Sequence, residues 1–284
     1  MNDPIQVMNQ VSISEPIRPA SNTRMKLQKG YRQWFNYTIG AVLPLTIIAV
    51  WQLVSSLGWT NEVFLPSPLQ IAAAFQTLIQ SGELLMHLGI SVERAAFGFF
   101  IGGSSGFLLG LAIGFLRRLE YVFDPTIQIL RLLPHLALAP IILLWFGFGE
   151  ESKVVIIAFG AFFPMYINTF IGIRSTDAKL LQAAQVLGFS RTTQLLRVTL
   201  PSALPNVLLG FRLSVAISWL SLVVAELVGS QEGVGFLINY GKQDSSTDLI
   251  FVGVIIFAVV GKLIDSLVRL LESRWLRWRE NYQG

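Results

Sequence analysis

The chain has 284 residues, of which 53% are hydrophobic and only 13% are charged. Soluble domains carry about 25% charged residues, so this composition excludes a water-exposed globule of this size. The chain has no cysteine, which excludes disulfides and thiolate chemistry, and its two histidines, His87 and His135, are far apart in sequence. We therefore expect a membrane protein with no metal site and no catalytic residues.

The N-terminal segment, residues 1–33, is polar and contains Pro4, Pro16 and Pro19. Such a composition cannot bury enough apolar surface to fold, so we expect a flexible tail. The segment is not a cleavable signal, because the first apolar run starts far from the N-terminus and is long enough to span a membrane. Residues 34–279 form the expected membrane domain, and residues 280–284 form a short C-terminal tail.

Six apolar runs in the membrane domain each come close to the ~20 residues that a helix needs to cross ~30 Å of hydrocarbon. They cover residues 39–57, 95–116, 126–147, 154–173, 206–229 and 250–271. The sequence therefore predicts an all-α integral membrane protein with six transmembrane helices.

Lysine and arginine are distributed unevenly among the segments that join these runs. They gather before the first run, after the second, between the fourth and fifth, and after the last, whereas the alternate segments hold mostly acids against Arg94, Lys153 and Lys242. Because positive residues stay on the cytoplasmic side, we place both termini and the central loop, residues 175–204, in the cytoplasm. This bias accounts for the net charge of +4, which therefore gives no support to nucleic-acid binding.

After the first run, a short helix is predicted over residues 69–80, with Ser67 as its cap, Pro68 in its first turn and Gly82 just beyond its end. It is too short and too polar to span. It either lies at the outer membrane surface or serves only as a connector.

The second run contains a stripe of glycines at every fourth residue, which lets another helix approach closely. The stripe consists of Gly98, Gly102, Gly106, Gly110 and Gly114. It packs either against another helix of the same subunit or against a second copy of the chain.

The third run contains Pro134 and Pro140, which are expected to bend its helix. A bent helix can line or gate a path, so Arg131, Pro134, His135 and Pro140 are candidates for that role, although proline also occurs in spanning helices for packing alone. We expect Arg131 to lie near the cytoplasmic end of this span and to snorkel there, with an anion contact as the alternative.

The central loop is predicted to contain two short helices. Asp177 or Thr176 can cap the first, which runs through residue 187 to a left-handed stop at Gly188. Ser190 can start the second, which we expect Pro201 to end before the fifth run opens.

The fifth run places Ser214, Ser218 and Ser221 on one narrow, weakly polar helix face. This face either lines a water-accessible path or serves packing, with the hydroxyls bonded back to backbone carbonyls. Glu226 lies near the outer end of the run, before a glycine-rich segment, and is a candidate outer-gate or loop-anchoring residue. In the sixth run, we expect Lys262 and Asp265 to pair, because they are three residues apart.

The central loop reads Gln182-Ala183-Ala184, three residues, Gly188, nine residues, and then Val198-x-Leu200-Pro201. This pattern resembles the loop Glu-Ala-Ala-x3-Gly-x9-Ile-x-Leu-Pro of permease subunits of binding-protein-dependent ABC importers, with Gln182 and Val198 replacing Glu and Ile. The segments Leu65-Pro66-Ser67-Pro68, Pro134-His135-Leu-Ala-Leu and Leu144-Trp-Phe-Gly resemble the sulfonate, taurine and nitrate permeases of that family.

The resemblance implies the permease fold of type I ABC importers, in a bacterial inner membrane. It implies a homodimer of this chain around the path, two ATP-binding subunits docked on the loop, and an extracytoplasmic substrate-binding protein. The chain contains no Gly-x4-Gly-Lys-Ser/Thr motif, so we expect the partner subunits to use the ATP and this chain to bind no cofactor. The implied substrate is a small anion, aliphatic sulfonates first, with taurine, nitrate or bicarbonate as alternatives.

Two other classes of protein fit the sequence less well. A secondary transporter driven by an ion gradient would show repeats or broken helices at matched positions in two halves, and no convincing internal repeat is visible. A membrane-embedded enzyme would need His, Cys or paired acids converging at one depth, whereas the ionisable residues of this chain are scattered.

Overall fold

The computed structural model describes residues 42–61 and 63–276, so both predicted tails, residues 1–33 and 280–284, lie outside the described residues. The chain divides after Trp59 into two compact units, and each is described by itself. The described part of the first unit contains one apolar helix, Val42–Ser56. A helix of this length rises about 22 Å, which is less than the hydrocarbon thickness.

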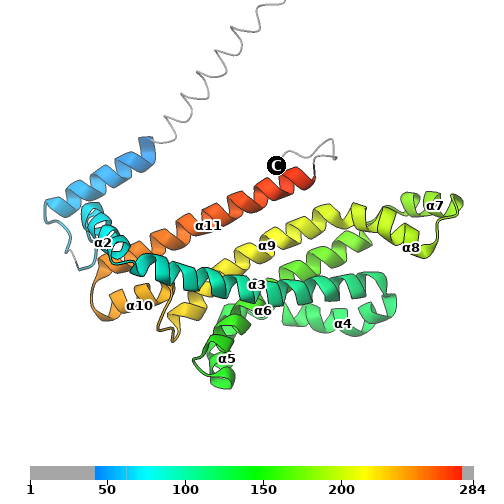
Figure 1. Ribbon diagram of the computed structural model, residues 1–284, viewed down its shortest axis with the longest axis horizontal. Helices are drawn as coiled ribbons and strands as arrows, with labels where there is room; N and C mark the ends of the chain where they lie inside the picture. Colours follow the sequence, from blue (N-terminus) through cyan, green and yellow to red (C-terminus); the bar gives the residue numbers. More distant parts are fainter. Residues whose placement is uncertain (1–41, 62, 277–284) are drawn as a thin grey trace, which may run out of the picture. The chain divides into compact units, whose positions relative to one another are not determined.

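The second unit is built from long helices that run side by side (Figure 1). Four of them are long and apolar enough to cross a membrane: α3 (Glu83–Phe115), α6 (Glu150–Arg174), α9 (Leu200–Leu227) and α11 (Thr247–Trp275). A fifth span is possible if two helices bent by 81° are counted as one. The described residues contain no β-strand, so the all-helical prediction is confirmed for them, with four or five candidate spans by length and composition.

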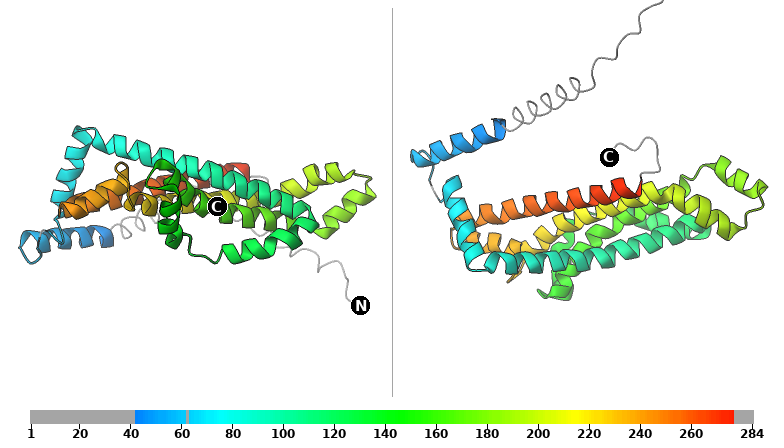
Figure 2. Two further views of the ribbon diagram at one scale, coloured as in Figure 1. Left: turned by 90° about the horizontal axis from the view of Figure 1, so that it is seen from below. Right: turned by 45° about the horizontal axis from the view of Figure 1, so that its top comes forward.

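The bent pair corresponds to the predicted third run. It consists of α4 (Arg117–Leu130), the 3-10 helix η1 (His135–Leu138) and α5 (Ala139–Phe146). In Figure 1, α4 lies along the long helices, whereas α5 turns away from them near their middle. Figure 2 shows the same separation from below, with an irregular connection joining the two.

The short helix predicted after the first run is α2 (Pro68–Gln80). It begins with a capping box, in which the Ser67 hydroxyl accepts from the backbone N–H of Gln70 and the Gln70 side chain accepts from the backbone N–H of Ser67. Its end is followed by Gly82, whose φ of 79° is a conformation that glycine adopts without strain. The cap, the first-turn proline and the stop are therefore as predicted.

The glycine stripe packs α3 against α6 of the same chain. A Cβ atom on Gly102 would overlap the backbone carbonyl of Ala158, and one on Gly106 would overlap that of Phe162. At Gly110, a Cβ atom would lie 2.8 Å from the backbone oxygen of Tyr166. The structure thus decides between the two alternatives for this stripe in favour of packing within the subunit, with backbone against backbone.

The central loop differs from its prediction at the second helix. The first helix, α7 (Ala178–Val186), is as expected, but the second, α8 (Arg191–Gln194), continues through a π-helical segment, η2 (Leu195–Thr199), directly into α9. Pro201 does not end this helix, because the π-helical turn η2 directly before it changes the local hydrogen-bond pattern and accommodates the missing N–H. Pro205 lies inside α9 rather than at its start.

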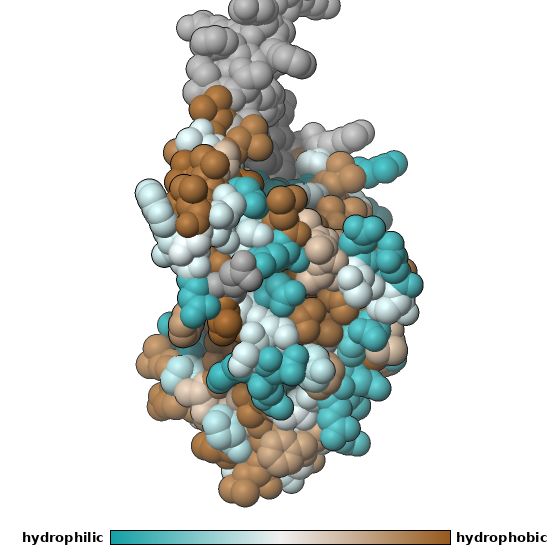
Figure 3. Space-filling view, turned by 90° about the vertical axis from the view of Figure 1, so that its left-hand side faces the viewer, coloured by the Kyte–Doolittle hydropathy of each residue, from teal (hydrophilic) through white to brown (hydrophobic). Residues whose placement is uncertain are grey.

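The two ends of the second unit differ in what they carry. One end carries α7 and α8, and the opposite end carries α2 and α10 (Val234–Gln243) (Figure 1). Viewed from the second of these ends, hydrophilic side chains gather on the surface (Figure 3), and residues 242–244 are exposed there. Long apolar helices with polar surface at an end are the arrangement expected of a membrane protein.

Candidate functional site

The loop end of the molecule presents a small, bare surface on α7. Gln182 and Ala183 are exposed, whereas Ala184 is only 4% exposed and packs inward. Beside them, Val186 and Leu187 are 88% and 71% exposed. Such exposure is unusual for apolar side chains in a polar loop. Exposed apolar side chains grouped in this way are typical of a surface that contacts another protein.

Gly188 forms the turn between the two loop helices. Its φ is 71°, and a Cβ atom placed on it would have no neighbour within 4 Å. The backbone conformation therefore favours glycine, and the absence of a side chain leaves open space above the turn.

The helix starts on either side of this turn are fixed by side-chain caps. The Asp177 carboxylate accepts from the backbone N–H of Lys179 at 2.8 Å, and the Ser190 hydroxyl accepts from that of Thr193 at 3.2 Å. The remaining predicted loop residues, Val198, Leu200 and Pro201, lie where η2 joins α9, with Pro201 exposed and the other two half-buried.

The predicted bend of the third run is a break, and its position differs from the prediction. Arg131 is the last residue to extend α4, Pro134 precedes η1, and the chain between them is irregular. Pro140 lies in the first turn of α5, where it starts a helix instead of bending one. The backbone therefore breaks before Pro134, because the residue before a proline is disfavoured in the helical region.

The break lies about halfway along the spans. Two contacts hold α4 antiparallel to α6: Arg174 donates to the carboxylate of Glu120, and the Tyr166 hydroxyl donates to that of Asp124 at 3.1 Å. Tyr166 is about 12 Å from Arg174 along α6, and Arg131 follows Asp124 by about 10 Å along α4. Arg131 therefore lies about 22 Å from the Arg174 end of α6, measured along that helix. Because α6 has 25 residues and is about 37 Å long, this position is near the middle of α6. The expectation that it sits at the end of its span is wrong.

The side chains at this break are open. Arg131 and Pro134 are exposed, and the guanidinium of Arg131 forms no hydrogen bond or ion pair with any described residue. His135 is half-buried, and its Nε2 atom is buried without a hydrogen-bond partner among the described residues.

The serine face of α9 is packed against α6. Ser214, Ser218 and Ser221 are each at most 2% exposed. The Ser214 hydroxyl donates to the backbone oxygen of Ala161 at 2.7 Å, and that of Ser218 donates to the backbone oxygen of Ser214 at 2.8 Å. The Ser221 hydroxyl is buried without a hydrogen-bond partner among the described residues. Ser214 and Ser218 are thus bonded as the packing alternative expects, and a path along this face stays a prediction.

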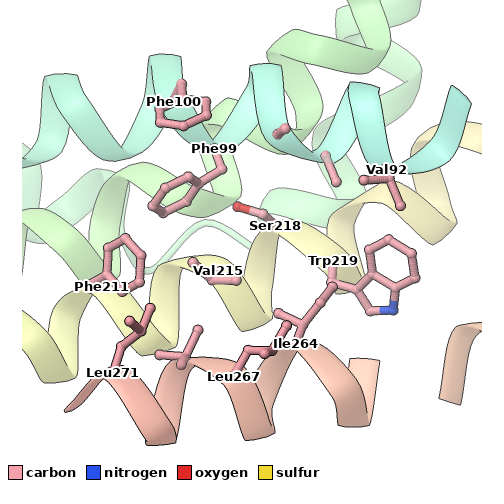
Figure 4. A pocket seen from close by; sticks show the side chains of 13 residues that line it. Val92, Phe99, Phe100, Phe211, Val215, Ser218, Trp219, Ile264, Leu267 and Leu271 are labelled. Atoms are coloured by element: carbon pink, nitrogen blue, oxygen red, sulfur yellow. The ribbon is translucent and has the colours of Figure 1, made fainter. Parts of the chain in front are cut away.

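A pocket of about 290 Å³ lies between α3, α9 and α11. Figure 4 shows the rings of Phe99, Phe211 and Trp219 around it, with the hydroxyl of Ser218 as a polar atom at its wall. That hydroxyl is already bonded, and the indole N–H of Trp219 donates to the backbone oxygen of Phe257 at 2.9 Å. The pocket therefore offers an anion almost nothing to bind.

A network of buried polar groups surrounds Glu226 at the end opposite the loop. Glu226 is 0% exposed and accepts from the Ser91 hydroxyl at 2.7 Å, from the Arg94 guanidinium at 2.9 Å and from the backbone N–H of Gly235 at 2.8 Å. Gly235 belongs to α10, so the carboxylate ties the segment after α9 back onto α3 and α9. These contacts agree with the loop-anchoring role considered for Glu226.

Arg94 extends this network, and sequence reasoning had missed it. It donates to both oxygens of Glu150 at 2.6 Å, while Lys153 donates to the same carboxylate at 2.8 Å. We had placed Arg94 and Lys153 in connecting segments, but they lie inside α3 and α6 and are 5% and 4% exposed. The signal that could have found them is that the apolar pattern of α3 begins well before residue 95.

The ion pair predicted in the last span is also wrong. Asp265 accepts from Arg212 of α9 and from Arg269, each at 3.0 Å, and Lys262 takes no part in an ion pair among residues 42–61 and 63–276. Arg212 also approaches Glu272 at 3.6 Å. Arg269 lies four residues after Asp265 on the same helix, where a spacing rule applies, whereas Arg212 lies on α9 and such a rule cannot foresee it.

Together, these features define a class of protein: a multi-span helical membrane protein with one broken span and a docking surface at one end, as in the membrane subunits of transporters. The chain belongs to the family of binding-protein-dependent transport system inner membrane components, whose sequence profile matches residues 85–277. The motif resemblance is thereby confirmed, and the chain is a permease subunit of an ABC importer of the inner membrane.

Relatives and a solved structure agree with this membership. The chain is 52% identical to a Bacillus subtilis protein named as an aliphatic sulfonates transport permease, over 94% of this chain and 96% of that protein. It is 44% identical to the Escherichia coli protein of the same name, over 88% and 95%. A chain in the crystal structure of an amino acid ABC transporter shares the fold with a TM-score of 0.59 at 17% identity, covering 70% of this chain and 97% of that one.

Proposed function

We propose that this chain forms the translocation path of an ATP-driven importer of aliphatic sulfonates. The names of its sulfonate-permease relatives support aliphatic sulfonates as the substrate. The exposed surface of α7 beside Gly188 supports the docking of ATP-binding subunits that drive the import. In this proposal the path is formed by a homodimer with six spans per subunit, the loop end is cytoplasmic, two ATP-binding subunits dock there, and a substrate-binding protein docks at the opposite end.

The loop is suited to receive force because it is rigidly continuous with a span. α8, η2 and α9 form one uninterrupted helical path, so a displacement at the loop moves the whole of α9. ATP binding would draw the two loops together and favour one state of the pair of subunits, and hydrolysis would restore the other. Such a cycle needs only a structure with two states, whose balance is shifted by the partners that bind at its two ends. It needs no chemical reaction within this chain.

Within this proposal, the break at Arg131–Pro134 is the candidate gate. An interrupted backbone halfway along the spans can rearrange at less cost than a continuous helix, because its hydrogen bonds are already open. Pro134 and His135 flank this break, and Pro140 sets the start of α5 beyond it. Glu226 is proposed as the fixed outer anchor against which the gate moves.

The docking model is tested by changing Gly188 in the complete complex reconstituted in proteoliposomes. Gly188→Arg forces a side chain into the open space above α7 and strains a left-handed backbone, so ATP-dependent ethanesulfonate uptake is expected to fall at least about tenfold, equivalent to about 1.4 kcal/mol of docking. Gly188→Asn tolerates the same backbone with a short side chain and is expected to keep most uptake.

The control is Gln243→Arg, which adds the same charge at an exposed position of the opposite end. Because the substrate-binding protein is proposed to dock there, this control is read by co-purification of the ATP-binding subunits, which Gly188→Arg should reduce and Gln243→Arg should leave unchanged. Normal uptake by Gly188→Arg, with normal abundance in the membrane, would refute docking at this surface. Stimulation of the ATPase by taurine, nitrate or bicarbonate instead of a sulfonate would correct the substrate. Uptake without ATP would favour an ion-gradient mechanism.

A further inference from the structure

Five cationic side chains in the described spanning helices are held by a carboxylate: Arg94, Lys153, Arg174, Arg212 and Arg269. Among the described cations of these helices without such a partner, Arg117, Arg118 and Arg274 lie in the end turns of α4 and α11. Arg131 and Lys262 also have no such partner among the described residues, are both exposed, and lie farther from the ends of their spans. An ionised group at membrane depth is costly unless it faces water, a ligand or an opposite charge, so each needs an explanation.

Lys262 is explained by its position on a continuous helix. Its neighbours Val259 and Leu263 are 52% and 57% exposed, which is the apolar surface that a spanning helix turns toward lipid. A lysine there can extend its flexible stem along the helix toward the membrane surface. It therefore requires no ligand.

Arg131 has different surroundings, because it lies where the backbone itself is interrupted. Non-helical backbone occurs at membrane depth only where it is buried in protein or lines a water-filled cavity. Arg131 and Pro134 are exposed, so in the described unit this stretch is not buried. The buried Nε2 atom of His135, one residue beyond, also lacks a hydrogen-bond partner among the described residues.

The side chains around the break combine a charged group with apolar surface, just as an aliphatic sulfonate combines an anionic head group with an apolar tail. Arg131 offers a planar fork of donors, which binds paired oxygens of an oxyanion at two points. The adjoining leucines Leu132, Leu133 and Leu136 are 77%, 42% and 38% exposed. They place apolar surface directly beside a cation, whereas the pocket between α3, α9 and α11 is lined by apolar side chains apart from Ser218.

We propose that Arg131 binds the oxyanion head group of the transported substrate inside the permease, with the leucines beside it contacting the aliphatic tail. This inference rests on the proposed function and adds to it a substrate site in this chain, distinct from that of any delivering protein. Arg131 then selects for anions during passage.

The test is equilibrium binding of radiolabelled ethanesulfonate to the purified complex of permease and ATPase, without the substrate-binding protein, in the nucleotide-free and ATP-bound states. Wild-type complex is expected to bind in at least one state. Arg131→Gln is expected to weaken binding at least about tenfold, because it removes a charge-assisted, two-point contact. Arg131→Lys keeps the charge without the fork and is expected to fall in between.

Lys262→Gln is the matched control, since it removes one unpaired cation from another span, and its binding is expected to stay within about twofold of wild type. Hexanesulfonate should bind wild type more tightly than ethanesulfonate, and Leu132→Ala should reduce that difference. ATPase activity and the subunit mass of each variant complex show whether assembly is intact.

Three results would overturn the inference: no binding by wild type in either state, unchanged binding by Arg131→Gln, or loss of assembly in both Arg131 variants. The last would show a structural ion pair with another subunit. Ethanesulfonate uptake by the full wild-type system separates the two proposals. Uptake with unchanged binding by Arg131→Gln refutes this site alone, whereas no sulfonate uptake by wild type refutes the proposed function.

Discussion

The network around Glu226 and the break at Arg131 differ in whether their charged and polar groups have partners. Around Glu226, buried donors from α3 and α10 converge on one carboxylate of α9. At the break, a guanidinium and a ring nitrogen are left without described partners. The first arrangement fixes three elements in one geometry, whereas the second leaves polar groups that no described residue holds in place.

This difference indicates where the permease is rigid and where it is free to change. A buried, fully bonded ion pair is costly to separate, because either partner alone would be left charged in an apolar surrounding. An open backbone beside an unpaired cation has no such cost. We therefore expect changes near Glu226 to act on stability, and changes at the break to act on transport.

The largest effect is expected from Glu226→Ala. The substitution leaves the buried guanidinium of Arg94 without one of its two carboxylates, and we expect a loss of about 3–5 kcal/mol of stability. The measurement is the unfolding midpoint of the purified permease in detergent, together with its abundance in membranes. Glu232→Ala removes an exposed acid nearby and should be close to neutral. Equal midpoints for the two variants would show that the network contributes little.

A smaller effect on the same network is expected from Gly235→Ala. The added methyl group would lie 2.5 Å from the Cβ atom of Glu226, which cannot move away because its carboxylate is held on several sides. We expect a loss of about 1–3 kcal/mol, as for other overpacked sites. Gly89→Ala is the control, because its Cβ atom would have no neighbour within 4 Å, and it should be neutral or stabilising by up to ~1 kcal/mol. If both variants unfold alike, packing against Glu226 is not the cause.

The smallest effect on stability, within about 0.5 kcal/mol, is expected from Pro134→Ala at the break, because Pro134 is exposed. Uptake should nevertheless fall several-fold. Removing the proline ring lowers the cost of a continuous helix by up to ~3 kcal/mol and so shifts the chain toward a straight span. Parallel measurements of unfolding midpoint and uptake check this, with Pro140→Ala, at a helix start, as the control. A loss of stability without a loss of transport would reverse the assignment of rigid and mobile regions.

The sequence predicted the elements whose causes are local. The capping box of α2 and the caps and glycine turn of the central loop depend on residues within a few positions of one another, so propensity and spacing identify them. The motif in the central loop was likewise sufficient to indicate the family. Pro201 misled the prediction, because a proline that a π-helical turn accommodates within a continuous helix and one that ends a helix look alike in sequence.

By itself, therefore, the sequence determined that this is a helical membrane permease, and it predicted which residues of the central loop form a docking site. Only the tertiary structure decided that the glycine stripe faces α6, that Asp265 pairs with Arg212 and that Arg94 reaches Glu226. It also placed Arg131 midway along the spans. The physical reason is that a spacing rule covers neighbours on one helix, whereas these partners lie up to 132 residues apart and meet only when whole helices pack against each other.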